Sequence, residues 1–353
     1  MRHNRDSLRQ LQSLPLEAKI VMSQRRIRDW YDYWDGQVYV SFSGGKDSTV
    51  LLDLVKKTPG VEDIPVVFVD TGLEYPEVRK FATERADVVI RPEMRFDEVI
   101  KRYGYPLPTK QIADAVAGAK RNPNSSRAAR LRGEYGGRRD GQPSKFNCKK
   151  WEFLLDAPFE VSAKCCDIMK KKPFKKYEKE TGRKPITGSL AQESLIRHRD
   201  WMRNGCNAFD TTNPSSRPLS FWTEHDILDY LVKNDLPYAS VYGEIVEEDG
   251  KLVTTGLDRT GCLFCCFGIA QEKSPNRFQQ MKETHPRQYA YCMKPVEQGG
   301  LGLHEVLDYI GVEHGYERKE REECASKTRQ TPRPSSGQQP QDEVMEEQTA
   351  SVV

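Results

Sequence analysis

The stretch that decides the fold is QVYVSFSGGKDS, from Gln37 to Ser48. Its first half, residues 37–42, is an apolar, β-branched run that predicts a buried strand. Residues 43–47 contain two glycines and predict a turn, and residues 48–57 predict a helix. The turn and the start of the helix both present backbone N–H groups, so this order of elements is typical of an anion site in an α/β fold.

The side chains of this loop strengthen the anion site. Lys46 supplies a point charge, and Ser43 and Ser48 supply hydroxyl donors. The loop is not the G-x4-G-K-[ST] phosphate loop, because Lys46 is followed by Asp47. An ordinary glycine turn is the alternative. The residues that we expect at the anion, with Lys46 and Asp47 taking part in the chemistry, are Ser41, Ser43, Gly44, Gly45, Lys46, Asp47 and Ser48.

Further apolar runs place this loop in a larger sheet. Residues 64–69 and 86–90 predict two more strands, and residues 185–188 resemble the end of another. The segment 223–234 predicts an amphipathic helix that begins at Thr223. Strands that alternate with helices predict an α/β fold with a doubly wound, mostly parallel sheet. A cysteine-rich C-terminal portion follows this fold.

The composition argues against a disordered, a membrane-spanning or a secreted protein. The chain has 353 residues and is 37% hydrophobic, which excludes wholesale disorder. No apolar stretch approaches the ~20 residues that span a bilayer, and the charged start lacks a secretory apolar region, so we expect a cytoplasmic protein without a membrane partner. We divide the chain into an N-terminal helical segment (1–34), a nucleotide-binding domain (35–270) with a basic insertion (117–150), a C-terminal helical extension (271–314) and a disordered tail (315–353).

The charge is unevenly distributed along the chain. The formal net charge is only +3, but residues 120–150 contain ten basic and two acidic residues. This basic segment, which reads as a long loop, therefore carries +8, and the remainder carries −5. It is a candidate contact for DNA or tRNA. The alternative is a solvated loop without a partner.

Four of the nine cysteines form a candidate metal site. Cys165 and Cys166 are adjacent, and Cys262 and Cys265 form a C-x2-C pair followed by Cys266, an alternative to Cys265. Four thiolates suffice for zinc or for an iron–sulfur cluster. An adjacent pair fits one tetrahedral ion less easily than a cubane, which offers separate irons. We therefore expect a [4Fe–4S] cluster, with zinc and the absence of any metal as alternatives.

Two motifs resemble a known family. The S-G-G-x-D-S loop resembles the pyrophosphate loop of the adenine nucleotide α-hydrolase-like superfamily. Residues 70–77, DTGLEYPE, are similar to the D-T-G-x-x-[FY]-P-E segment of phosphoadenosine phosphosulfate (PAPS) reductases. The resemblance implies an adenine nucleotide, accompanied by Mg²⁺, as ligand. It also implies that the adenosine pocket is lined by this edge, with Asp70, Thr71, Gly72 and Glu74.

A third motif extends the resemblance over roughly residues 35–270. Residues 187–197 are similar to the T-G-x-R-x-x-[EQ]-S-x-x-R motif of PAPS reductases, but Leu190 replaces the first arginine. The spacing of the cysteine pairs resembles the [4Fe–4S] site of adenylylsulfate (APS) and PAPS reductases, and that of DNA phosphorothioation sulfurtransferases. By resemblance, the nucleotide-facing residues of the third motif are Gly188, Glu193, Ser194 and Arg197.

The C-terminal part departs from the family pattern. Sulfonucleotide reductases attack sulfate with a cysteine in an E-C-G-[LI]-H motif, and the nearest segment here, EECAS at 322–326, lacks the glycine and the histidine. Cys324 is the candidate nucleophile if the protein is a PAPS or APS reductase served by a thioredoxin-like reductant. The second hypothesis is an ATP-dependent sulfurtransferase that takes sulfur from a donor and modifies DNA or tRNA. The third is a non-catalytic nucleotide-binding regulatory protein.

Overall fold

The computed structural model describes residues 3–61, 63–137 and 142–316. Its main sheet has six strands in the order β3-β2-β1-β4-β6-β5, and every pair is parallel except β5–β6. The predicted doubly wound, mostly parallel sheet is therefore confirmed. The strands are β1 (Val38–Phe42), β2 (Val66–Val69), β3 (Val88–Ile90), β4 (Lys184–Thr187), β5 (Asn207–Ala208) and β6 (Ser215–Ser216).

Strand β1 forms the centre of the sheet. Its Val40 pairs with Val66 of β2 on one side and with Ile186 of β4 on the other. All three side chains are buried, as expected for parallel strands that are covered on both faces. The carboxyl ends of β1, β2 and β4 consequently meet at one edge, where α/β folds place their ligands.

Helices cover both faces of the sheet. One face packs against α2 (Leu16–Tyr33), α3 (Lys46–Lys56) and α10 (Glu224–Lys233), whose apolar side chains share a core with β1. The other face packs against α4 (Pro76–Thr83) and α8 (Lys172–Thr181). We call this unit the sheet lobe. At its margin lie α1 (Arg5–Gln12), α9 (Leu195–Asn204) and the short 3₁₀ helices η3 (Ala191–Glu193) and η4 (Ser240–Tyr242).

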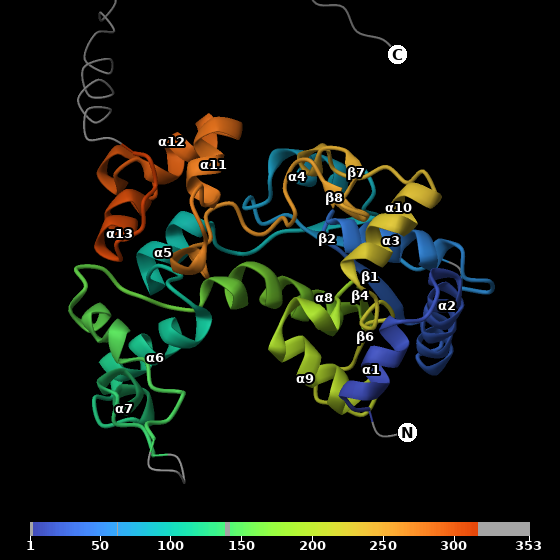
Figure 1. The fold of residues 1–353 in the computed structure, drawn as a ribbon, viewed down its shortest axis with the longest axis horizontal. Helices are drawn as coiled ribbons and strands as arrows, with labels where there is room; N and C mark the ends of the chain where they lie inside the picture. The colour runs from blue at the N-terminus through green and yellow to red at the C-terminus, as the bar shows by residue number, and fades with distance from the viewer. Residues whose placement is uncertain (1–2, 62, 138–141, 317–353) are drawn as a thin grey trace, which may run out of the picture.

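A second group of helices lies beside the sheet lobe and is called the helical lobe (Figure 1). The π-helical turn η2 (Asp167–Lys171) runs directly into α8 and passes between the two lobes. Apolar side chains from both lobes form one continuous core. The helical lobe contains α5 (Phe96–Tyr103), α6 (Lys110–Arg121), α7 (Ser126–Arg132), α11 (Arg277–Thr284), α12 (Pro286–Met293), α13 (Leu303–Tyr309) and the 3₁₀ segments η1 (Lys149–Asp156), η5 (Ile269–Gln271) and η6 (Val296–Gln298).

The basic insertion at 117–150 is not the long loop that its composition predicts. It contains the end of α6, all of α7 and the start of η1. Helix α7 begins at Ser125, whose hydroxyl accepts from the backbone N–H of Ala128, and ends at Gly133 in a left-handed conformation. Ala128 and Leu131 are buried in the helical lobe. Tertiary packing therefore stabilises a helix that the weak apolar pattern of this segment does not predict.

A two-stranded hairpin is a second feature that the sequence interpretation did not include. Strands β7 (Ile245–Glu248) and β8 (Lys251–Thr254) pair antiparallel through a turn at Asp249 and Gly250, both with positive φ. An Asp-Gly pair of this kind is a strong local hairpin signal. The hairpin is followed by the loop that leads to Cys262. Separately, no helix among the described residues is long and apolar enough to cross a membrane.

Candidate functional site

The glycine-rich loop forms a tight turn between β1 and α3. Gly44 has φ +74°, and a Cβ there would lie 2.8 Å from the carbonyl oxygen of Val78, so only glycine fits. The Ser43 and Ser48 hydroxyls lie 3.1 Å apart and tie the turn together. Gly45 is the N-cap of α3 and offers no side-chain acceptor to the first N–H groups of the helix. The backbone N–H of Lys46 hydrogen-bonds with Tyr242, whereas the N–H groups of the next helix residues have no intrahelical acceptor and can bind an anion.

A cavity of about 280 Å³ lies over this loop and is called the phosphate cavity. Residues that the sequence predicted come to it from the glycine-rich loop and from the segment after β4. The structure adds residues from α10, η2, η4 and the loop at 258–260. The lining residues are Ser43, Gly45, Lys46, Asp47, Ser48, Lys170, Gly188, Leu190, Glu193, Arg197, Glu224, Tyr242, Asp258, Arg259 and Thr260.

A smaller cavity of about 100 Å³ continues from the phosphate cavity along the ends of β1 and β2. It shares Ser43, Lys170 and Thr260 with the larger one. Its walls are more apolar, which suits the base of a nucleotide better than its phosphates. The other lining residues are Ser41, Phe42, Phe68, Val69, Glu74, Val78, Phe174 and Gly261.

Charged side chains inside the phosphate cavity are already paired with one another. Lys46 Nζ lies 3.2 Å from Glu224 Oε1 and 5.2 Å from the centre of the Tyr242 ring. Arg197 forms an ion pair with Glu193. Burial raises the pKa of Asp47 to about 6, against the opposing effect of Lys46. The cavity therefore carries cations that are held in place before any ligand arrives.

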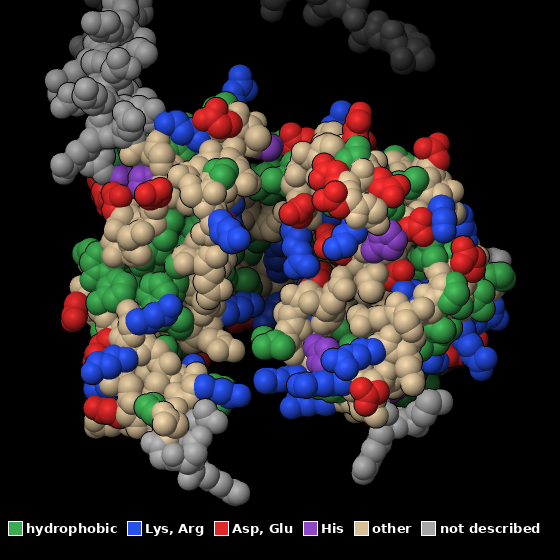
Figure 2. Space-filling model, in the orientation of Figure 1, with side chains coloured by type: hydrophobic (Ala, Val, Ile, Leu, Met, Phe, Trp, Pro, Cys, Tyr) green, Lys and Arg blue, Asp and Glu red, His purple; other side chains and the backbone are tan. Residues whose placement is uncertain are grey.

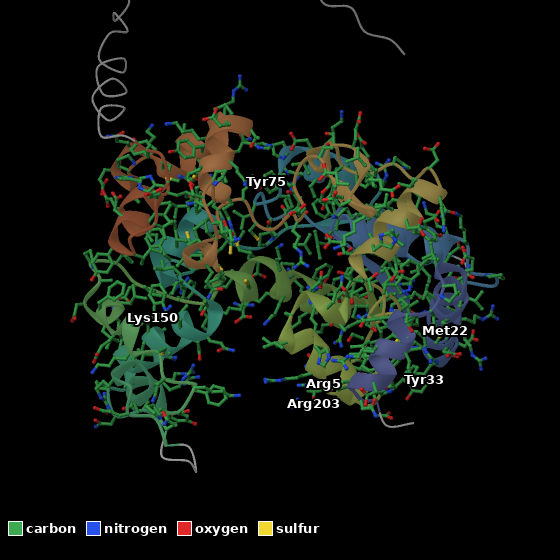
Figure 3. All side chains as sticks on the ribbon, in the orientation of Figure 1. Arg5, Met22, Tyr33, Tyr75, Lys150 and Arg203 are labelled. Atoms are coloured by element: carbon green, nitrogen blue, oxygen red, sulfur yellow. The ribbon has the colours of Figure 1, made fainter. Side chains whose placement is uncertain are left out.

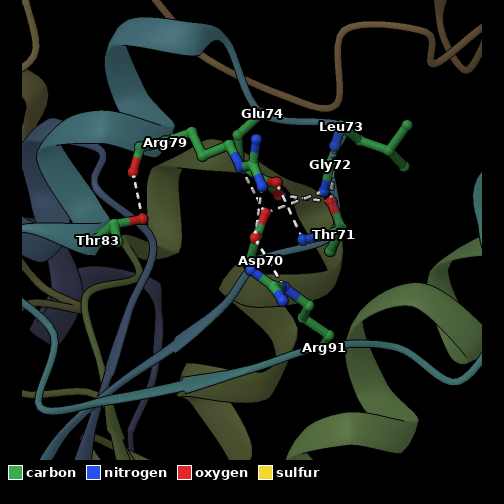
Figure 4. A network of polar contacts seen from close by, with 8 residues as sticks. All are labelled: Asp70, Thr71, Gly72, Leu73, Glu74, Arg79, Thr83 and Arg91. Atoms are coloured by element: carbon green, nitrogen blue, oxygen red, sulfur yellow. Dashed lines mark hydrogen bonds and ion pairs between the residues drawn. The ribbon is translucent and has the colours of Figure 1, made fainter. Parts of the chain in front are cut away.

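Asp70 does not face either cavity. Its carboxylate accepts two 2.7 Å hydrogen bonds from Arg79 and one of 3.2 Å from Arg91 (Figure 4). These hydrogen bonds, chiefly from Arg79, lower the pKa of Asp70. The expectation that Asp70 contacts the nucleotide directly does not fit this geometry, because its oxygens are occupied. Its role is to hold the turn that follows β2.

The other predicted residues of the 70–77 segment, except Glu74, also do not line the cavities. Thr71 donates a 2.7 Å hydrogen bond to Glu74, and Gly72 donates to Asp70 through its backbone. Of the four residues predicted here, Glu74 alone lines the smaller cavity.

Two further predicted residues, Ser194 and Cys324, lie outside the 70–77 segment. Ser194, predicted at the nucleotide, instead caps α9 by accepting from the backbone N–H of Arg197. The candidate nucleophile Cys324 lies outside the described residues.

The two cysteine pairs face each other where the lobes meet. Cys165 and Cys166 precede η2, with 3.9 Å between their Sγ atoms. The charge of Cys166 affects Cys262 and Cys265, so the four thiols share one electrostatic environment. The hydrogen bond from Cys165, followed by Lys110 and Lys170, lowers the pKa of Cys166 to about 6. Figure 3 shows sulfur atoms in this region, in yellow.

As the structure places them, the four thiols do not converge on one point. Among the described residues, no group of three or more His, Cys, Asp or Glu could hold one metal ion. A tetrahedral zinc site needs four ligands around one point, whereas a cluster spreads its ligands over separate irons. Cys266 is fully buried in the core, and burial raises its pKa well above the usual value, whereas Cys265 is partly exposed.

Lys170 connects the phosphate cavity with the cysteine group. Its side chain lines both nucleotide cavities. Burial opposes its charge, but Cys262, Glu74 and Cys166 outweigh that effect and raise the pKa of Lys170. Lys170 therefore stays protonated, and the two sites are neighbours because its side chain also hydrogen-bonds with Cys262.

Seven residues of the phosphate cavity were not among the predicted site residues: Lys170, Leu190, Glu224, Tyr242, Asp258, Arg259 and Thr260. Arg259 lies in the loop that separates the phosphate cavity from two larger cavities on the outside. Its only signal in the sequence is its position just before Gly261 and Cys262. Glu224 and Tyr242 are brought in by the long-range packing of α10 and η4.

Comparison with known proteins gives one family match. The model of the phosphoadenosine phosphosulfate reductase domain matches residues 37–106 and 134–266. Two uncharacterised proteins of Methanocaldococcus jannaschii are 23% and 27% identical over 87% and 68% of this chain. The matches span only 58% and 38% of those proteins. An adenosine 5'-phosphosulfate reductase of Staphylococcus haemolyticus is 26% identical over 60% of this chain and 67% of its own.

Solved structures align with this chain only weakly. A PAPS reductase from Candida auris aligns with a TM-score of 0.37 at 15% identity, covering 70% of this chain and 97% of its own. A U34-tRNA thiolase from Methanococcus maripaludis, solved with its [4Fe–4S] cluster, aligns with a TM-score of 0.32 over 85% of this chain and 83% of its own.

Proposed function

The chain belongs to the phosphoadenosine phosphosulfate reductase domain family, and on this premise we propose that it is an enzyme that couples an adenine nucleotide to sulfur chemistry at its four-cysteine group. The observation that carries the proposal is the position of Lys170. It lines the nucleotide cavities and is charge-coupled to Cys166 and Cys262. A phosphate or sulfate group held by Lys170 would lie beside the thiols.

In this proposal the nucleotide lies along the edge of the sheet. Its phosphates occupy the phosphate cavity, where the N–H groups at the start of α3, Lys46, Arg197 and Arg259 supply donors and positive charge. Its base extends toward Phe68 and Val69 in the smaller cavity. Mg²⁺ accompanies the phosphates, and the Asp47 carboxylate is the ligand that the loop offers to it.

The reaction that we favour is activation of an acceptor by ATP before sulfur transfer. An oxygen of the acceptor bonds to the α-phosphorus, the bond from that phosphorus to the pyrophosphate breaks, and pyrophosphate leaves. Lys46 and Arg197 stabilise the charge that develops on the leaving group. The complete SGGKDS loop supports this choice, because it combines the Lys46 cation with the start of a helix, where backbone N–H groups can bind pyrophosphate oxygens.

The cysteine group provides the sulfur chemistry. Cys165, Cys166, Cys262 and Cys265 would hold a [4Fe–4S] cluster, which when bound supplies electrons or an iron site for sulfur. Lys110 and Lys170 contribute positive charge on the side of Cys166. Such charge favours the reduced, more negative state of a cluster and attracts an anionic sulfur donor.

Sulfonucleotide reduction is the second candidate function, and the DTGLEYPE segment at 70–77 favours it. In that reaction a thiolate bonds to the sulfur of PAPS or APS and the bond from sulfur to the nucleotide oxygen breaks. A thioredoxin-like dithiol then releases sulfite and becomes a disulfide. The nucleophile would be Cys324, outside the described residues.

A single assay on anaerobically purified protein tests the proposal. ATP, APS and PAPS are offered separately, and both pyrophosphate and sulfite are measured. Pyrophosphate from ATP with an acceptor present supports sulfurtransfer, and sulfite from APS or PAPS supports reduction. Absence of both products, with nucleotide still bound, would instead identify a regulatory nucleotide-binding protein. Lys46→Ala is the loss-of-binding variant, and Lys56→Ala, an exposed lysine at the end of α3, is its control.

A further inference from the structure

Helix α9 presents two consecutive apolar side chains to solvent. Leu195 is 74% exposed and Ile196 is 68% exposed, the highest values among the large hydrophobic residues that the structure describes as exposed. Single exposed apolar residues are common on protein surfaces, but an adjacent pair beside a cavity is a mark of a contact surface. The next residue, Arg197, lines the phosphate cavity. On α9 the pair therefore directly precedes a residue of the proposed nucleotide site.

Basic side chains surround this apolar pair. Arg199 and Arg203 on α9 and Arg5 on α1 are exposed, and among the described residues none has an ion-pair partner. Arg5, Leu195 and neighbouring residues line a groove of about 450 Å³ between α1 and α9. In Figure 3, Arg5 and Arg203 both lie on the side of the sheet lobe that faces the helical lobe. We call Arg5, Leu195, Ile196, Arg199 and Arg203 the α9 wall.

The opposite side of the hollow between the lobes is basic as well. Figure 2 shows Lys and Arg side chains on both sides of this hollow. Helices α6 and α7 lie across from α9 (Figure 1) and carry the exposed Lys110, Arg121 and Arg127. Arg127 is neutralised by Asp114 at 2.9 Å, but the side chain of Lys110 hydrogen-bonds with the Cys166 thiol. The hollow is thus basic on the side of α9 and on the side of α6 and α7.

We propose that this hollow binds a single-stranded polynucleotide, which is the acceptor in the favoured reaction; the inference rests on that proposed function. Arginines on both walls match the repeated phosphates of such a chain. Leu195 and Ile196 offer apolar surface to the face of a base, and a base has a free face only where it is unpaired. An acidic protein would satisfy the arginines but leave the apolar pair without a matching group.

Direct binding to the full chain tests this inference. The probes are fluorescently labelled single strands of about 20 nucleotides, one RNA and one DNA, measured by anisotropy from about 50 to 200 mM salt. We expect binding that weakens steeply with salt. The variant Ile196→Ser/Arg203→Glu, on the α9 wall, should weaken it by about tenfold or more, because it removes an apolar contact and reverses a charge. Comparison of the two probes shows which sugar is preferred.

Helix α2 offers a matched control. Val21 is 66% exposed and Arg25, one turn later, is also exposed, but α2 lies on the far side of the sheet lobe from the hollow. Val21→Ser/Arg25→Glu makes the same chemical change and should leave affinity within about twofold. Equal loss in both variants, no binding at low salt, or tighter binding of a duplex would overturn the inference. Arg5→Glu, on the neighbouring α1, gives a second, independent variant.

A parallel measurement separates this inference from the proposed function. ATP affinity of the α9-wall variant should equal that of the unaltered protein, because neither Ile196 nor Arg203 lines the phosphate cavity. If the unaltered protein binds the strands but no adenine nucleotide, the proposed function fails and the polynucleotide site stands. If it binds and cleaves ATP but ignores both strands, the polynucleotide site fails alone.

Discussion

Lys46 Nζ lies 3.2 Å from Glu224 Oε1, although the two residues are 178 positions apart in the chain. The Lys46 side chain is 7% exposed and that of Glu224 is 42% exposed. The carboxylate therefore occupies a direction from which a phosphate would approach the lysine. Any anion that enters the phosphate cavity must compete with Glu224 for Lys46.

This competition predicts opposite effects for the two partners. Lys46→Ala should weaken ATP binding by about tenfold or more, because a charged hydrogen bond to phosphate is worth ~1.5–3 kcal/mol. Glu224→Gln should strengthen it severalfold, because it removes the competing negative charge. Calorimetric titration at fixed ionic strength measures both. Glu248→Gln, on the exposed hairpin, is the charge-matched control, and weaker binding in Glu224→Gln would contradict the competition.

The pH dependence of stability should report on Asp47. Burial raises its pKa to about 6, whereas an unfolded aspartate titrates near ~4. Between these values the folded protein keeps a proton that the unfolded chain has released, so the contribution of Asp47 favours folding at pH 4 and is lost as the pH rises through 6.

Asp47→Asn should therefore gain stability relative to the unaltered protein as the pH rises from about 4 to 7, by at most about 3 kcal/mol. Urea unfolding of ligand-free protein at several pH values measures the difference. Asp249→Asn, in the hairpin turn, should show no such trend. A difference that is constant with pH would show that Asp47 has an ordinary pKa.

The fold could be predicted from sequence where its signals are local. The run from Gln37 to Ser48 contains a strand, a turn and a helix start within twelve residues, and the structure has them in that order. The hairpin was missed although Asp249-Gly250 marks its turn, because two short, half-exposed strands have only a weak apolar alternation.

The site was less predictable because distant segments complete it. Glu224, Tyr242 and Arg259 reach the phosphate cavity through packing of α10, η4 and the loop before Cys262. Asp70 is a predicted site residue that distant packing keeps out of the site. It lies at the expected strand end, but Arg91, which follows β3, reaches across to its carboxylate. A single sequence does not encode such pairings in any local pattern.

The cofactor proposal predicts specific losses of iron. Anaerobically purified protein should contain about four irons and four sulfides per chain, as a [4Fe–4S] cluster requires. Cys166→Ser and Cys262→Ser should each lose most of both. Cys148→Ser, which changes a half-buried cysteine outside the group, should keep them. Iron and acid-labile sulfide are measured chemically. One zinc per chain without iron would contradict the cluster and show that the cysteines bind zinc.

A buried ion pair that supports the sheet lobe predicts a large stability effect. Lys19 Nζ lies 2.6 Å from Asp226 Oδ2, and Lys19 is 1% exposed. Asp226 also accepts from Thr223 at the start of α10. Lys19→Met leaves this carboxylate buried without its cation and should cost ~3–5 kcal/mol in urea unfolding. Asp226→Asn added to Lys19→Met should restore part of that loss, and a Lys19→Met cost below ~1 kcal/mol would contradict the importance of the pair.

The last prediction concerns the contact between β4 and the glycine-rich loop. A Cβ on Gly188 would lie 2.8 Å from the carbonyl oxygen of Asp47 and 3.0 Å from the backbone nitrogen of Ser48. Gly188→Ala must therefore push the loop away from the strand end. Since the N–H groups of this loop bind the phosphates in our proposal, ATP affinity should fall by about tenfold, with a smaller loss of thermal stability. Gly137→Ala, where a Cβ meets nothing within 4 Å, is the control. Unchanged affinity in Gly188→Ala would mean that the nucleotide phosphates do not contact this part of the loop.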